Sequence, residues 1–427
     1  MADATALVES VFRQESGRII ATLIRLSGSF DLAEEAMQEA FTSAVSSWPE
    51  NGVPDNPGAW ITTVARRKLI DFVRRENTRR DKQDAISYET ESSQQPEFDL
   101  SEDASMMYSD DRLRLMFTCC HPALNIEAQV ALTLRTLGGL TTAEIARAFL
   151  LPEPTLAQRL VRAKSKIRTA RIPYEIPPIH MLPERLTSVQ AVIYLVFNEG
   201  YSATAGDSLV RKELCMEAIR LGRTLCELLP KEPENIGLLA LMLLHDSRRE
   251  ARTNSKGELV PLEDQDRSLW NYEHIREGQE LVERALRMQR IGGYQLQAAI
   301  AAVHGHAKAA ADTDWHEIAA LYRELARISP TPVVALNHAV AVAMSAGLEK
   351  GLGLIDQLGA SGELDKYYLF HAARADILRR LGRKQEAMDA YEKAIALVTN
   401  RVEDAYLQRR LAQLRDSLQS KILPEIS

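Results

Sequence analysis

The chain has 427 residues, of which 45% are hydrophobic and 26% charged, and its net charge is −7. This length predicts two to four domains, and the composition is that of an ordinary globular protein. Because the chain has no apolar run of 18 residues and no basic N-terminal stretch followed by an apolar one, we expect neither a membrane span nor a secretory signal, and we expect a cytoplasmic protein.

The negative charge is unevenly distributed along the chain. Residues 1–171 hold 21 Lys and Arg and 24 Asp and Glu, and nine of these acids lie in 84–111, which contain no Lys or Arg. Without that segment, the N-terminal part has 21 basic and 15 acidic residues. A basic module interrupted by an acidic spacer is compatible with nucleic-acid binding.

The first domain is predicted over residues 1–80 and should be helical. A helix that follows Asp31, a suitable N-cap, carries one apolar stripe that runs from Leu32 to Val45 and Trp48. An acidic and polar face lies off that stripe. It consists of Asp31, Glu34, Glu35, Gln38 and Glu39. Three prolines and a glycine in 49–57 should end the helix.

A second helix is predicted from about 58 to 77, where cations alternate with apolar and aromatic side chains. The cations are Arg66, Arg67, Lys68, Arg74 and Arg75. Cations neutralise phosphates and aromatic rings stack on unpaired bases, so this helix suits DNA whose strands have separated. We expect Phe72 to be a core residue, whereas Trp60 could serve either the core or the DNA.

Residues 81–111 are predicted to be a flexible acidic linker, and helices resume over 112–171. Within that second domain, 140–168 has the pattern of a helix-turn-helix, with Thr141 or Thr142 capping a short helix at 144–149. A turn at 150–154 follows, where Pro152 and Pro154 should keep the residues before them, Leu151 and Glu153, extended. The helix predicted over 155–171 is basic and contains no acid.

This basic helix has the residues that a recognition helix needs in a major groove. Side chains near its start would read base edges, and cations farther along would contact phosphates. The candidates for base reading are Thr155, Gln158, Arg159 and Arg162, and those for phosphates are Lys164, Lys166 and Arg168.

A proline-rich connector, 172–183, leads to a helical segment over 184–427. Residues 371–399 have the order of apolar and small residues found in a tetratricopeptide repeat, and weaker copies precede them. We therefore expect an all-α fold with two small helical domains and a tetratricopeptide-like extension. A groove between such repeats typically accepts a peptide or helix, so a protein or peptide partner is expected there.

The N-terminal motifs resemble those of RNA polymerase sigma factors of the sigma-70 family. DLAEEAMQEAF from residue 31 and NPGAWITTVARRKLIDFVRR from residue 56 resemble region 2, while LTTAEIARAF from residue 140 and TLAQRLVRAKSKIR from residue 155 resemble region 4. Their order, with an acidic linker in place of a third domain, is similar to the extracytoplasmic-function class, and the tail to its subgroup with a long C-terminal extension. Leu150 departs from the glycine usual in the family's turn, so the turn geometry should differ.

The resemblance implies a role for each surface. The acidic face would bind the clamp helices of the largest polymerase subunit. The loop 53–56 and the second helix would hold the melted −10 element, through Asn56, Trp60 and the five cations, and the basic helix would read the −35 element. The extension would modulate this activity, and we favour a positive role for it. The alternatives are a DNA-binding regulator with tetratricopeptide repeats that does not act through polymerase, and an interaction scaffold.

We expect no catalytic residue, cofactor or metal site, because the chain lacks the common catalytic and nucleotide-binding motifs. His304, His306 and His316 are expected to be ordinary helix residues. No two cysteines form a C-x-x-C pair, and the adjacent Cys119 and Cys120 are expected to be small packed residues.

Overall fold

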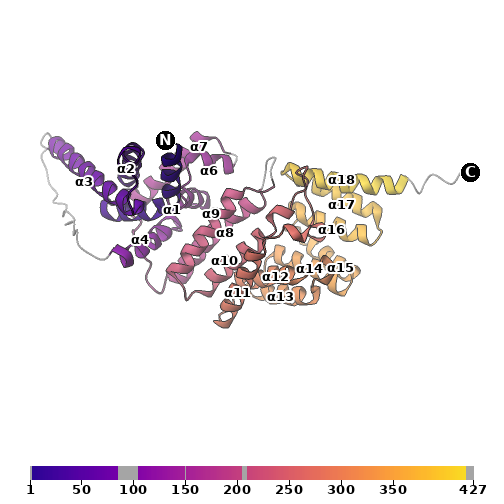
Figure 1. The fold of residues 1–427 in the computed structure, drawn as a ribbon. Helices are drawn as coiled ribbons and strands as arrows, with labels where there is room; N and C mark the ends of the chain where they lie inside the picture. Colours follow the sequence, from indigo (N-terminus) through magenta and orange to yellow (C-terminus); the bar gives the residue numbers. More distant parts are fainter. Residues whose placement is uncertain (1, 85–103, 150, 204–208, 420–427) are drawn as a thin grey trace, which may run out of the picture. The chain divides into compact units, whose positions relative to one another are not determined.

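The computed structural model describes residues 2–84, 104–149, 151–203 and 209–419 (Figure 1). The regular structure of these residues is helical apart from isolated bridge residues at Thr253, Leu259 and Asn400, which confirms the all-α fold. The chain divides into two compact units, Met1–Ile193 and Tyr194–Ser427. None of the described helices is both long and apolar enough to cross a membrane.

Unit 1 is organised around its first helix. Its helices are α1 (Ala2–Ser27), α2 (Phe30–Asn51), α3 (Pro57–Asp84), α4 (Ala104–Cys119), α5 (Ile126–Thr136), α6 (Thr142–Ala148), α7 (Glu153–Thr169) and the first part of α8 (Leu182–Tyr201). Helix α1 packs against α2, α3, α4 and α5, and it buries Ile19, Ile20 and Leu23. The two predicted N-terminal domains thus share α1 as a packing surface.

Two glycines allow α1 to approach the end of α5 closely. A Cβ atom at Gly17 would lie 2.8 Å from the carbonyl oxygen of Leu137, and one at Gly139 would lie 2.6 Å from the Ser16 hydroxyl oxygen. Gly139 also has a φ of +67°, a conformation that glycine adopts without strain. Larger residues at these positions would force the two helices apart.

Helices extend into both ends of the predicted linker, 81–111. Helix α3 continues to Asp84 and α4 begins at Ala104, while 85–103 lie outside the described residues. The Asp111 side chain is 1% exposed and accepts hydrogen bonds from Arg25 (2.9 Å) and Arg114 (2.8 Å). These two guanidinium groups compensate the buried carboxylate, so the last acid of the predicted linker is an anchor between α4 and α1.

The predicted connector, 172–183, is also part of unit 1. The Tyr174 hydroxyl donates a hydrogen bond to the carbonyl of Ala21 (2.7 Å) and approaches that of Asp111 (3.1 Å). Arg185, which is 7% exposed, donates to the carbonyl of Phe117 at 2.5 Å. These contacts hold the start of α8 on unit 1, so the division between units falls after Ile193, ten residues beyond the predicted boundary.

The helix-turn-helix is present as α6 and α7. Thr141 caps α6, because its hydroxyl oxygen accepts from the Glu144 amide (3.1 Å) while the Glu144 carboxylate accepts from the Thr141 amide (2.7 Å). Helix α7 begins at Glu153, which we had expected to be extended. Pro154 then occupies the first turn, where a missing amide proton breaks no helical hydrogen bond. Leu150 lies outside the described residues.

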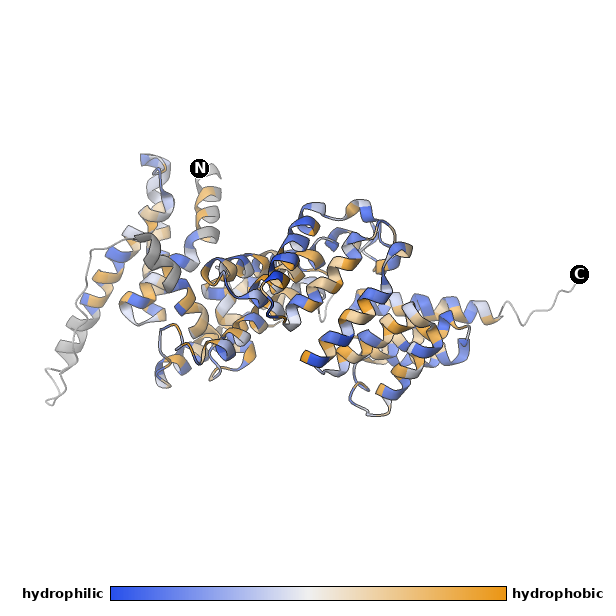
Figure 2. Cartoon of the chain, turned by 90° about the horizontal axis from the view of Figure 1, so that it is seen from below, coloured by the Kyte–Doolittle hydropathy of each residue, from blue (hydrophilic) through white to orange (hydrophobic). Residues whose placement is uncertain are grey.

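Unit 2 continues from α8 as a series of helices in which neighbours along the chain pack on one another. They are α9 (Lys212–Leu228), α10 (Pro233–Asp246), α11 (Tyr272–Arg287), α12 (Gly293–His306), α13 (Trp315–Ile328), α14 (Pro332–Ala346), α15 (Leu348–Gly359), α16 (Tyr368–Arg380), α17 (Lys384–Leu397) and α18 (Arg401–Gln419). Hydrophobic residues lie mainly on the faces that the helices turn toward each other (Figure 2). The pair α16–α17 spans the segment with the best repeat pattern, and the tetratricopeptide assignment stays a prediction.

Candidate nucleic-acid and protein interface

Helix α2 presents the predicted acidic face to solvent. Its N-cap is Ser29, whose hydroxyl oxygen accepts from the Leu32 amide at 3.3 Å, so the prediction that Asp31 caps the helix is wrong. Asp31 instead lies in the first turn, where the helix dipole favours a carboxylate. The predicted apolar stripe is largely buried, although Val45 at its end is 45% exposed. Of the acidic-face residues, Asp31, Glu35, Gln38 and Glu39 are exposed and Glu34 is half-buried.

Helix α3 carries the predicted cations beside this face. Arg67, Arg74 and Arg75 are exposed, and Arg66 and Lys68 are half-buried. The Lys68 ammonium lies 3.2 Å from the Glu39 carboxylate, so the basic helix and the acidic face adjoin. The side chains are 37% and 51% exposed, so water screens the pair and it contributes little to stability.

The structure gives the remaining candidates of this segment local roles. Asn56 caps α3, because its side-chain oxygen accepts from the Ala59 amide at 3.0 Å. Trp60 is half-buried and packs edge-on against Trp48, with ring centroids 5.7 Å apart. Phe72 is half-buried as well, although we had expected it in the core. Part of the surface of both rings therefore remains accessible beside the cations.

Helix α7 has a sharply divided surface. Leu156, Leu160, Ala163 and Ile167 form its buried stripe. At about 100° per residue, the opposite face carries six residues. These are Pro154, Gln158, Val161, Arg162, Ser165 and Thr169. Arg159 lies on the flank and is half-buried, whereas Thr155, Lys166 and Arg168 are exposed.

Sequence reasoning missed Val161, whose side chain is 65% exposed on this outward face. The predicted candidates were chosen for polar or charged chemistry, which excludes valine. A helical projection from the buried stripe would have placed Val161 beside Gln158 and Arg162 without a structure.

Lys164 joins the two predicted interfaces. Its ammonium lies 3.0 Å from the Asp31 carboxylate and 2.7 Å from that of Glu34, and only 15% of its side chain is exposed. The other Glu34 oxygen is buried and has no hydrogen-bond partner in the described chain. A predicted phosphate contact of α7 is therefore engaged by two residues of the predicted protein-binding face of α2.

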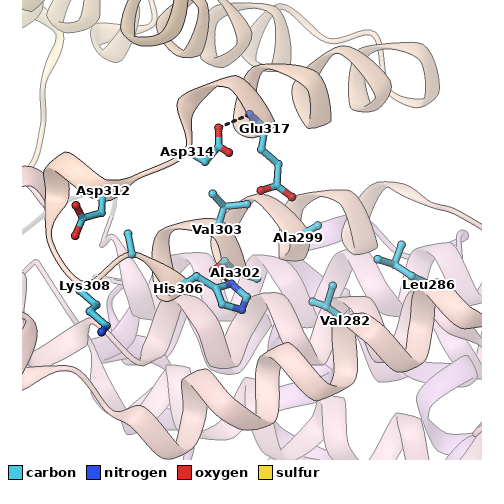
Figure 3. Close-up of a pocket in the computed structure, with 11 residues that line it drawn as sticks. Val282, Leu286, Ala299, Ala302, Val303, His306, Lys308, Asp312, Asp314 and Glu317 are labelled. Carbon is cyan, nitrogen blue, oxygen red and sulfur yellow. Dashed lines mark hydrogen bonds between the residues drawn. The ribbon is translucent and has the colours of Figure 1, made fainter.

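Unit 2 contains a cavity of about 640 Å³ between α11, α12 and α13 (Figure 3). Its apolar lining consists of Val282, Leu286, Ala299, Ala302 and Val303. Asp312, Asp314 and Glu317 contribute three carboxylates, against one ammonium from Lys308. Asp314 accepts from the Glu317 amide at 2.9 Å and so caps α13, and the Glu317 side chain points toward the apolar residues. The cavity thus combines an apolar lining with an acidic rim.

Cys119, Cys120 and His304 are packing residues, whereas His306 and His316 are exposed. Cys119 and Cys120 are buried as expected, and burial raises the pKa of the Cys120 thiol to about 12. His304 packs edge-on against Trp315, with ring centroids 5.3 Å apart. Burial, helped by Arg248 and Arg267, lowers the pKa of His304 to about 4. Among the described residues, no three His, Cys, Asp or Glu side chains are grouped as metal ligands.

Three protein-family models match separate parts of the chain. Sigma-70 region 2 matches residues 11–79, which contain α2 and most of α3. Sigma-70 region 4 matches 114–167, which contain α6 and most of α7. A family of unknown function, DUF6596, matches 185–286, from α8 to α11.

Two curated relatives differ in how much of the chain they cover. An uncharacterized protein of Rhizobium meliloti (strain 1021) is 45% identical over 92% of this chain and 93% of its own length. The probable ECF RNA polymerase sigma factor SigI of Mycobacterium tuberculosis is 25% identical over 172 residues, which are 40% of this chain and 58% of that protein. The first similarity therefore includes the extension, whereas the second covers less than half of the chain.

Proposed function

Because the chain belongs to the sigma-70 family, as an extracytoplasmic-function sigma factor with a long C-terminal extension, we propose that it directs core RNA polymerase to specific promoters by reading their −10 and −35 elements. The observation that carries this proposal is the presence of two separate basic helices, α3 and α7, in one unit. A conventional regulator needs only one helix-turn-helix, so α3 would have no role in it. The protein acts by binding and catalyses nothing itself.

Each surface has the chemistry for one of three contacts. The exposed acids of α2 suit a basic surface of core polymerase. The cations of α3, with the half-buried Trp60 beside them, suit the separated strands of the −10 element. Helix α7 suits the major groove of the −35 element, with Gln158 and Arg162 directed away from its buried stripe.

Promoter binding requires unit 1 to open. The names of the two elements place them about 25 base pairs apart, roughly 85 Å of duplex at about 3.4 Å per base pair. Helices α7 and α2 are held together by Lys164, so the unit as described cannot reach both elements at once. The free protein is therefore a closed form, and polymerase or DNA separates the two regions.

Transcription with purified core polymerase tests the main proposal. A library of promoter fragments is transcribed with core polymerase alone and with the full chain added. We expect specific start sites only with the full chain, and we expect their use to depend on Arg162. If the chain binds the same fragments but never supports initiation, a conventional regulator replaces the proposed function.

The cavity of unit 2 supports a second contact for the extension. A basic amphipathic segment of a partner protein fits it best, because apolar side chains would meet its apolar lining and Lys or Arg would meet its three carboxylates. A fluorescent helical peptide of leucine and lysine is the probe, with a leucine–glutamate peptide as its control. Glu317→Lys should weaken binding of the lysine peptide, and Glu324→Lys, a matched change on α13 outside the cavity lining, should not. Equal binding of both peptides would refute the cavity as a binding site for basic segments.

A further inference from the structure

Val161 is an anomaly on its helix. The four side chains of the buried stripe of α7 include every other leucine, isoleucine or valine in that helix, and each of them is at most 8% exposed. Val161 is 65% exposed. It lies on the outward face, one turn from Gln158 and next to Arg162. A branched apolar side chain thus stands among the polar side chains that suit base edges.

Packing within unit 1 does not account for this valine. Lys164, three residues farther along α7, brings that helix against the start of α2. Even in this closed form most of the Val161 side chain remains accessible. Val161 therefore contributes little to the core or to the contact between α7 and α2, and its isopropyl group is available to a ligand.

The major groove offers one apolar group to such a side chain. Of the four bases, only thymine carries a methyl group there, and apolar side chains recognise it by contact. Gln158 and Arg162 have the hydrogen-bonding groups that read adenine and guanine. An apolar reader beside Gln158, on the same face as Arg162, completes a surface that can distinguish thymine from cytosine.

We propose that Val161 is a specificity-determining residue that contacts the 5-methyl group of one thymine in the −35 element. This inference rests on the proposed function, since it requires α7 to lie in the major groove of a promoter. Burying one methyl group against Val161 should raise affinity for that promoter about fourfold.

Removing single thymine methyl groups from the DNA tests the contact. Each thymine on either strand of the −35 element is replaced in turn by deoxyuridine, which lacks only the methyl group. Promoter affinity is then measured with the full chain and core polymerase. The affinity of the unsubstituted protein should fall about fourfold when deoxyuridine stands at one position and should not change when it stands at the others. Val161→Ala should lower the affinity for the thymine promoter by a similar factor. The variant should then bind the thymine and deoxyuridine promoters equally well at that position.

Matched variants complete the experiment. Val333→Ala removes another exposed valine, 38% exposed on α14 of unit 2, and should keep the full deoxyuridine effect. Arg162→Ala should lower the affinity for the promoter but preserve the discrimination against deoxyuridine. If every deoxyuridine promoter binds as well as its thymine parent while Arg162→Ala still weakens binding, the Val161 contact is refuted and the promoter-reading function stands. If the full chain supports no promoter-specific binding at all, both proposals fail.

Discussion

At the scale of single residues, α7 divides its cations by the direction in which they point. Arg162 lies on the face opposite the buried stripe, whereas Lys166 lies on a flank. Arg162→Ala should reduce transcription and relax the preference at one position of the −35 element by about 1–3 kcal/mol, if the contact to that base is bidentate. Lys166→Ala should weaken all promoters by a similar factor. A promoter library measured with both variants checks this division, which is wrong if they give the same profile.

His304 makes the stability of unit 2 depend on pH. Its pKa is about 4 in the folded protein and near 6.5 in an unfolded chain, so between these values only the unfolded chain binds the proton. The free energy of unfolding should therefore fall as the pH decreases from 6.5 to 4, by at most about 3 kcal/mol from this residue. Urea unfolding of the full chain at a series of pH values measures the slope.

Substitution isolates the contribution of this imidazole from that of the acidic residues. His304→Phe keeps an aromatic ring against Trp315 and should make the stability profile between pH 4 and 6.5 shallower. His316→Phe, the same change at an exposed position of α13, should leave the slope as it is. A steep profile that persists in His304→Phe would assign the dependence to other groups.

At the scale of helices, α2 presents two faces with different tasks. Its buried face holds unit 1 together, and its exposed face is the proposed polymerase contact. Glu35→Lys combined with Gln38→Lys should weaken binding of core polymerase about tenfold or more, because like charges would meet across the interface. Both positions are exposed, so the fold should persist.

A titration with labelled core polymerase measures this effect. Glu349→Lys with Gln357→Lys is the control, because it makes the same change in charge at two exposed positions of α15. Unchanged affinity in the α2 variant would exclude its acidic face as the docking surface.

Local patterns explain which helices were predictable from the sequence. Apolar periodicity and the capping threonine located α2, α6 and α7 to within a few residues. Contacts between distant segments were not predictable, because nothing near Asp111 in sequence indicates that Arg25, 86 residues away, would neutralise it. The same holds for Lys164 and Asp31, which are 133 residues apart. The acidic segment 81–111 indicated a flexible linker and the prolines of 172–183 a connector, yet Asp111, Tyr174 and Arg185 are tied into unit 1 by such distant contacts.

At the scale of the whole molecule, unit 1 ends at Ile193. A truncation that removes the extension and keeps all of unit 1 therefore ends at this residue. We propose that the extension helps to hold the complex in a productive arrangement. We therefore expect a chain that ends there to fold but to support less transcription than the full chain. Circular dichroism and thermal unfolding verify the fold, and multi-round transcription measures the activity. Higher activity from the folded truncation would show that the extension inhibits.

A truncation after Arg171 would be misleading. It removes Tyr174 and Arg185, whose hydrogen bonds to Ala21 and Phe117 belong to unit 1. Its lower stability would then be mistaken for a contribution of the extension. Comparing the unfolding midpoints of the two truncations separates these effects, and we expect the shorter chain to unfold at the lower temperature.

The bridge from Lys164 to Asp31 and Glu34 makes the two binding reactions of this protein thermodynamically linked. Under the proposed roles of α2 and α7, whichever of polymerase and promoter arrives first breaks the bridge, and the second then binds a surface that is already free. The factor by which polymerase raises the affinity for DNA must therefore equal the factor by which DNA raises the affinity for polymerase. A bacterial chromosome offers on the order of a million competing non-specific sites. A lysine that is withheld from phosphates until polymerase is bound would keep the unbound factor from being sequestered along the chromosome.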